Sequence, residues 1–164
     1  SSSQFENFLF TFIFVNYNQF IMDKISSKYI KCRLFNSENK NLINKNILNF
    51  YDYYETKNGE EKFLITNFKK SPHFKSLKSS NFDNYEIYLN LSNQEDHSVR
   101  KYMKLINDFD EKFLEEFKIE LKEIEYKRKK FYLIIDGLHR VSLYFFSTKN
   151  KYLPAKYFKI NNFS

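Results

Sequence analysis

Phe131–Arg140, FYLIIDGLHR, has the strongest structural pattern in this sequence. Its first half, Phe131–Ile135, is a nearly continuous apolar run, which is typical of a central strand buried on both faces. Asp136 and Gly137 break this run, and the following residues His139–Thr148, HRVSLYFFST, have the pattern of a short helix. The sequence therefore predicts a strand, a tight turn and a helix in direct succession.

This corner has the residue types of a phosphate-binding site. The first turn of a helix presents backbone N–H groups and the positive end of the helix dipole, which together attract anions. Gly137 permits a sharp turn and a close approach of the backbone to a ligand. His139 and Arg140 add a titratable imidazole and a planar cation suited to bidentate phosphate contacts. Asp136, at the end of the strand, could orient a hydroxyl, hold Mg²⁺ or clamp the turn.

The segments around this corner predict further elements of the second half. Ser98–Phe117 is the clearest helix, because its apolar residues recur at spacings of three and four. Phe117–Tyr126 alternates apolar and charged residues and predicts a strand, and the basic run Lys127–Lys130 is its turn. Tyr152–Ile160 is predicted to be a closing strand, and Pro154 near its start places it near a sheet edge.

The first half of the chain gives weaker patterns. Phe5–Val15 is aromatic and β-branched, which favours a strand, and Tyr29–Phe35 alternates as a half-buried strand does. An Asn-Gly turn signal in Lys57–Glu60 would join strands near Phe50–Glu55 and Lys62–Thr66.

The elements together predict an α+β (mixed α/β) fold, a mixed sheet flanked by helices. The 164 residues suit a single domain over 1–164. Within it, residues 1–90 are the N-terminal part, and residues 91–164 are the helix–strand–strand–helix–strand part that holds the corner. The basic segment Phe68–Ser80 is expected to be a loop.

Composition and charge exclude several classes of protein. Hydrophobic residues make up 42% and only two residues each are Gly and Pro, which excludes a disordered chain. The net charge of +7 attracts phosphorylated ligands, nucleic acid or anionic lipid. Because the lysines are spread along the chain, we expect a solvated basic surface and no sequence-specific DNA binding.

The single cysteine and the most apolar run indicate the cellular location of the protein. Cys32 is alone, which excludes a disulfide framework and a cysteine metal site and fits a reducing cytoplasm, so we predict a cytoplasmic protein. Phe8–Val15 is too short for a membrane helix, and no membrane span is expected. A buried strand or a homo-oligomer contact is the better interpretation of this run.

The corner resembles the nucleotide-phosphate site of the ParB/sulfiredoxin-like superfamily, where a strand ending in Asp-Gly is followed by x-His-Arg or x-Arg-Arg at a helix start. The matching residues here are Asp136-Gly137-Leu138-His139-Arg140, and the similar layout covers Phe117–Ile160. The resemblance implies that Gly137, Leu138, His139 and Arg140 hold nucleotide phosphates. Sulfiredoxin carries a nucleophilic cysteine where this chain has Leu138, so sulfinic acid reductase activity is not expected. The helix-turn-helix region of chromosome-partitioning ParB proteins is also not expected here.

The Asp-Gly-x-His-Arg form is similar to small-molecule kinases of this superfamily, such as free serine kinases. It implies an ATP-dependent phosphotransferase (kinase) that uses Mg²⁺ and acts on a small hydroxyl-bearing metabolite, amino acid or sugar. Asp136 would hold the metal ion or orient the acceptor, and His139 would contact the transferring phosphate or relay a proton. The alternatives are a non-catalytic nucleotide-binding switch, a DNA-associated ParB-like module, and an interaction protein that assembles through its aromatic N-terminal strand.

A kinase also needs groups that hold its acceptor. Glu95 and His97, just before the long helix, are catalytic candidates, and Lys75 and His73 are candidates for lining the phosphate or acceptor pocket. Each has a simpler interpretation: Glu95 would favour the helix dipole ahead of an N-cap at Ser98, and His73 would be a surface or packing residue.

Overall fold

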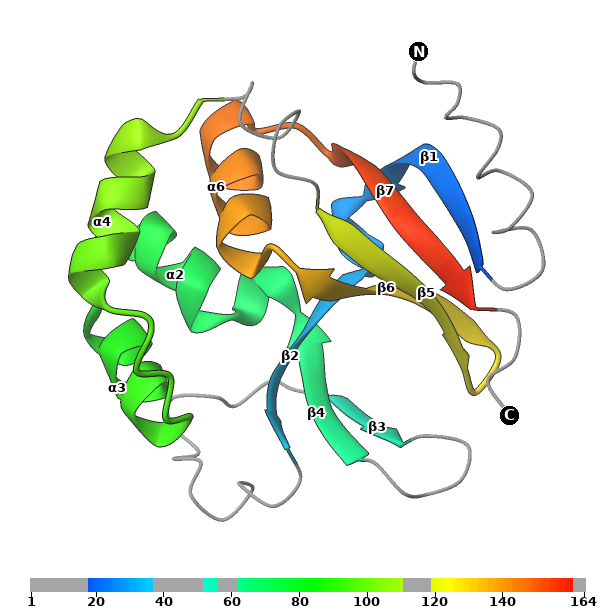
Figure 1. The fold of residues 1–164 in the computed structure, drawn as a ribbon, viewed down its shortest axis with the longest axis horizontal. Coiled ribbons are helices and arrows are strands. Elements are labelled where there is room, and N and C mark those ends of the chain that lie inside the picture. The colour runs from blue at the N-terminus through cyan, green and yellow to red at the C-terminus, as the bar shows by residue number, and fades with distance from the viewer. Residues whose placement is uncertain (1–17, 37–51, 56–61, 111–118, 161–164) are drawn as a thin grey trace.

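The computed structural model of this protein describes residues 18–36, 52–55, 62–110 and 119–160 (Figure 1). Within these residues the fold is α+β, with a mixed sheet in the order β1-β7-β5-β6-β2-β4-β3. The strands are β1 (Asn18–Ser26), β2 (Ile30–Asn36), β3 (Asp52–Glu55), β4 (Lys62–Asn67), β5 (Glu120–Tyr126), β6 (Lys129–Asp136) and β7 (Tyr152–Ile160). The fold class predicted from the sequence is therefore confirmed.

Helices cover one side of this sheet, on the left in Figure 1. They are α2 (Pro72–Ser79), α3 (Asp83–Leu91), α4 (Val99–Asp108) and α6 (Leu138–Thr148), with short 3-10 turns at Ser27–Tyr29 and Phe68–Lys70. The core between helices and sheet contains Ile30, Cys32 and Leu34 of β2 and Val141, Leu143 and Phe145 of α6. Burial of each large apolar side chain contributes about 1.5–3 kcal/mol to stability.

Strand β6 is buried from both sides, as its apolar run predicts. Ile134 belongs to the core beneath the helices. Phe131 and Leu133 form a second buried cluster with Ile65 and Ile124, and these four side chains alternate with the helix-facing ones along their strands.

The pairing of β6 decides what lies beside the Asp136 corner. β6 is antiparallel to β5 and parallel to β2, with Ile30 opposite Tyr132 and Lys31 opposite Leu133. Because parallel strands end at the same edge of a sheet, the carboxyl ends of β2 and β6 meet there.

Several predicted elements are confirmed. β2, β5, β6, α6 and β7 lie where their patterns place them, and β3 and β4 form the predicted antiparallel pair. Lys127 and Arg128 form the turn between β5 and β6, with φ of 51° and 64°. The predicted strand Phe5–Val15 and the turn at Lys57–Glu60 lie outside the described residues.

Three expectations from the sequence are wrong. Phe68–Ser80 is not a loop, because the Ser71 hydroxyl caps α2 by accepting from the N–H of Phe74 at 3.2 Å and Pro72 suits the first helical position. Helix α4 ends at Asp108, earlier than predicted, and residues 111–117 of the predicted helix lie outside the described residues.

The third error is the position of β7, which lies between β1 and β5 and not at an edge. Pro154 is nevertheless tolerated, because it stands opposite Lys24 of β1, before the pairing with β5 begins at Lys156. Two elements, β1 and α3, were not predicted.

Candidate functional site

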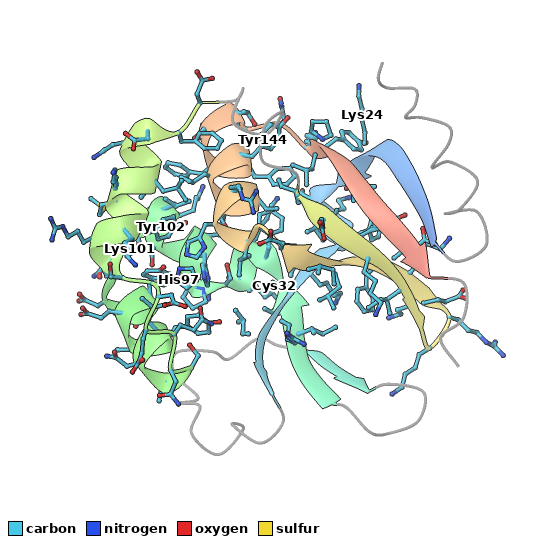
Figure 2. The ribbon with its side chains drawn as sticks, viewed as in Figure 1. Lys24, Cys32, His97, Lys101, Tyr102 and Tyr144 are labelled. Atoms are coloured by element: carbon cyan, nitrogen blue, oxygen red, sulfur yellow. The ribbon has the colours of Figure 1, made fainter. Side chains whose placement is uncertain are left out.

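A cleft of about 390 Å³ opens where the ends of β2 and β6 meet the beginning of α6. In Figure 2, Cys32 lies on the strand side of this cleft and His97 on the helical side. The lining residues are Cys32, Arg33, His73, Tyr88, Gln94, His97, Leu105 and the continuous run 134–140. All three histidines of the chain are among them.

Gly137 shapes the rim of the cleft. It has a φ of 107° and precedes α6 without a side-chain cap, and its carbonyl accepts from the N–H of Val141 at 2.8 Å. The N–H groups of the first turn, those of Leu138 and His139, have no acceptor inside the helix. A Cβ at Gly137 would lie 3.3 Å from Cγ1 of Ile119 and 3.5 Å from Nη2 of Arg140. The backbone angle therefore favours glycine, and a larger residue would also have to displace the Ile119 side chain slightly.

The fixed charge of the cleft is positive. Arg33 and Arg140 line it as permanent cations, and Asp136 is the one carboxyl group among its described lining residues. Arg140 reaches back to Asp136, with Nη2 3.2 Å from Oδ2, and the two side chains are 17% and 68% exposed. The guanidinium is thus largely held against the protein, while the carboxylate remains open to solvent.

The three histidines form a cluster around His139. Its ring centroid lies 4.6 Å from that of His73 and 5.0 Å from that of His97. Burial, with His97 and Arg140 nearby, lowers the pKa of His139 to about 4. Burial lowers the pKa of His73 well below its ordinary value, and the other two histidines add to this. Both rings are therefore neutral near pH 7.

His73 has a buried polar atom without a partner among the described residues. The residue is 2% exposed, and its Nδ1 is buried and makes no hydrogen bond within the part of the chain that the structure describes. Its backbone carbonyl accepts from the Tyr102 hydroxyl at 3.0 Å, which anchors α2 to α4. An unsatisfied buried group costs about 1–3 kcal/mol, so this nitrogen is suited to a bound water or ligand.

Tyr88 links residues in the lining of the cleft by hydrogen bonds. Its hydroxyl donates to the carbonyl of Leu34 in β2 at 3.3 Å and accepts from Nε2 of Gln94 at 3.0 Å. Burial raises the pKa of Tyr88 to about 12, so the phenol stays protonated. These bonds fix Gln94 beside the carboxyl end of β2.

Most of the predicted site residues come together in this cleft. Asp136, Gly137, Leu138, His139 and Arg140 line it with His73 and His97. His73 is thus buried rather than a surface residue. Two predicted residues lie elsewhere.

Glu95 and Lys75 do not line the cleft. Glu95 lines a second cavity of about 310 Å³, which shares Gln94 and His97 with the first. Lys75 is exposed on α2 and lines neither cavity. Ser98 caps α4, since its Oγ accepts from the N–H of Lys101 at 3.1 Å, as the simpler interpretation of the Glu95 segment predicts.

Arg33, Gln94, Tyr88 and Cys32 were not predicted as site residues. The scarcity of arginine in the sequence is a signal that points to Arg33, but nothing local relates Gln94 or Tyr88 to the corner. Cys32 is 1% exposed, and burial raises the pKa of its thiol to about 12. The thiol therefore stays protonated and is not a nucleophile at neutral pH.

Comparison with known proteins adds no relative: no protein-family model, no curated protein and no solved structure matches this chain. In the part of the chain that the structure describes, no helix is long and apolar enough to cross a membrane. Among the same residues, no group of three or more His, Cys, Asp or Glu side chains suits a metal ion.

Proposed function

We propose that the cleft binds the phosphates of a nucleoside triphosphate, and that the protein is an ATP-dependent phosphotransferase acting on a small hydroxyl-bearing acceptor. The observation that carries this proposal is the convergence of the first turn of α6, Gly137, Arg140 and Arg33 in one cleft. The helix start provides oriented N–H donors, and the arginines provide permanent positive charge. The volume is in the range of small-molecule sites.

Asp136 is the residue that would meet Mg²⁺. It is the one carboxylate among the described residues that line the cleft, and its side chain is 68% exposed. Mg²⁺ is commonly held by one or two carboxylates together with substrate phosphates and water, so a dedicated protein cage is not required. The ion would neutralise phosphate charge beside Arg140.

The second cavity offers a place for the acceptor. It adjoins the cleft through Gln94 and His97 and is lined by polar groups that include Glu86, Asn90 and Glu95. A hydroxyl held there would attack the γ-phosphorus as the bond to the β,γ-bridging oxygen breaks, releasing ADP, and its proton would pass to Asp136 or to water. Phosphoryl transfer of this kind depends mainly on positioning and charge neutralisation.

A non-catalytic nucleotide switch is the second candidate, and one observation favours it. Asp136 is paired with Arg140, and the pKa of His139, about 4, makes this ring a weak base. The cleft therefore has no strong general base among these residues. A protein that only binds and releases nucleotide needs none.

Titration calorimetry with ATP, CTP, GTP and ADP in the presence of Mg²⁺ tests the proposal. We expect saturable binding that Arg140→Ala weakens by about 1.5–3 kcal/mol, the scale of a charge-assisted hydrogen bond. Arg100→Ala is the matched control, because Arg100 is exposed at the start of α4 and outside the cleft. Equal binding by wild type and Arg140→Ala would remove this corner from the site.

Turnover separates the two candidates. ³¹P NMR follows ATP with a panel of alcohols, amino acids and sugars as acceptors. A phosphorylated acceptor supports the kinase, whereas nucleotide binding without acceptor-dependent turnover supports the switch. Absence of binding by every nucleotide would reject both.

A further inference from the structure

The hydroxyl of Tyr85 lies 2.8 Å from Nε2 of His139, within the cluster of rings behind the cleft. Tyr85 is fully buried, at 0% exposure, and comes from the inner face of α3. No other hydrogen bond of its hydroxyl is found in the described part of the chain. The geometry alone permits either group to donate, because the tautomer of a neutral histidine decides its role.

The buried phenol decides the direction of this bond. If Nε2 carried the proton, it would donate to the phenol oxygen, and the phenol proton would have no acceptor in a buried place. A buried O–H group without an acceptor is costly. A phenol oxygen that already donates a hydrogen bond loses much less when one of its lone pairs is unused. The satisfied arrangement has Tyr85 donating to Nε2, which leaves the proton of the neutral ring on Nδ1.

Packing holds Tyr85 in this position. Its ring lies 4.9 Å from that of Tyr102 and 5.1 Å from that of His73, and Phe82 packs edge-on at 6.4 Å. Tyr102 is itself fixed by its bond to the His73 carbonyl. The phenol is therefore packed between residues of α2 and α4, which restricts the positions that its hydroxyl can take.

We propose that Tyr85 is a positioning residue that fixes His139 as the Nδ1–H tautomer, so that the imidazole offers a hydrogen-bond donor to the cleft. His139 lines the cleft, and Nδ1 is the ring nitrogen that Tyr85 does not occupy. A neutral N–H donor suits an oxyanion, which needs donors and no proton acceptor. The identity of that oxyanion as a phosphoryl oxygen rests on the proposed function, whereas the tautomer does not.

This assignment changes the role expected of His139. With Nε2 engaged by Tyr85 and Nδ1 protonated, the ring has no lone pair available to accept a proton from a substrate. His139 is then a hydrogen-bond donor to bound phosphate and not a general base. Proton acceptance in a kinase would have to come from Asp136 or from water.

NMR of protein labelled with ¹⁵N-histidine tests the tautomer directly at pH 7.5. Long-range ¹H–¹⁵N correlations distinguish Nδ1–H from Nε2–H rings, and His139→Gln identifies the signal of His139 among the three. We expect the Nδ1–H pattern in wild type and its loss or mixing in Tyr85→Phe, which keeps the ring but removes the hydroxyl. Tyr102→Phe is the matched control, because it also removes a buried phenol from the cluster but not the partner of His139. It should leave the tautomer unchanged.

The binding measurement uses ATP with Mg²⁺ as the probe. Tyr85→Phe should weaken binding about 3- to 10-fold, the effect of one misdirected hydrogen bond, and thermal melting confirms that it is folded. A wild-type Nε2–H pattern, or a tautomer that Tyr85→Phe does not alter, would overturn the inference. If the tautomer responds as expected but wild type binds no nucleotide, the proposed function fails while the positioning role of Tyr85 is supported.

Discussion

Nη2 of Arg140 lies 3.2 Å from Oδ2 of Asp136, one helical turn earlier in the chain. The pair joins the last residue of β6 to the first turn of α6 across Gly137. A phosphate entering the cleft would compete with Asp136 for the guanidinium. Binding of a ligand would thereby release the carboxylate toward a metal ion or an acceptor, so the two residues are expected to respond differently to substitution.

Asp136→Asn should affect turnover much more than folding. The side chain is 68% exposed and its ion pair is of the surface type, which contributes about 0–1 kcal/mol. We expect a melting temperature within a few degrees of wild type and phosphoryl transfer lower by about 10²-fold or more. Asp108→Asn, at the exposed end of α4, is the control. Early melting of Asp136→Asn would instead identify the carboxylate as a clamp of the turn.

Gly137→Ala should destabilise the protein and damage the cleft. A residue with a Cβ at φ 107° is strained, and the added atom would lie 3.3 Å from Ile119, so unfolding in urea should show a loss of about 1–3 kcal/mol. Ser80→Gly is the reverse kind of substitution, because it introduces glycine at a position of positive φ: Ser80 ends α2 at a φ of 57°. Glycine there should preserve or raise stability by up to about 1 kcal/mol. Unchanged stability in Gly137→Ala would show that the turn relaxes freely.

Stability should fall as the pH falls below neutrality. The folded pKa of His139 is lowered to about 4 and that of His73 lies well below 6.5, so the folded state favours the neutral rings. The unfolded chain binds protons first, near its ordinary pKa, and the stabilisation present above about pH 6.5 is lost progressively toward pH 4. Urea unfolding from pH 7.5 to 4.5 measures this slope.

His139→Gln should reduce that slope, since it removes one of the two buried titrating groups. The titratable and charged groups that face the ring are His73, His97, Arg140, Tyr85 and Tyr102, and none of them is changed in this variant. A slope equal to that of wild type would show that His139 does not contribute to the acid sensitivity.

Ser98→Ala should cost about 1 kcal/mol, because it removes the hydroxyl that accepts from the N–H of Lys101. Ser98→Asp should recover most of this loss by capping the same helix. The free energy of unfolding in urea distinguishes the two variants. Equal stability of wild type and Ser98→Ala would contradict the capping role. The segment before α4 would then again be a candidate part of the site.

The local elements were predictable where the signal was itself local. The apolar run of β6, the Asp136-Gly137 break and the apolar spacing of α6 act within one turn or strand, and the alternation of Ile30, Cys32 and Leu34 marks β2 in the same way. Helix α2 was missed because its buried face includes His73 and Ser76, polar residues that hide the apolar period.

The residue types of the corner could be predicted from the sequence alone: an Asp-Gly turn followed by His139 and Arg140 at a helix start. The surroundings of the corner depend on the tertiary structure. The parallel pairing of β2 with β6 brings Arg33 to the cleft. The packing of α2, α3 and α4 brings His73 and Tyr85 to His139. Strand neighbours and helix docking depend on burial summed over residues far apart in the chain, and no local pattern encodes that sum.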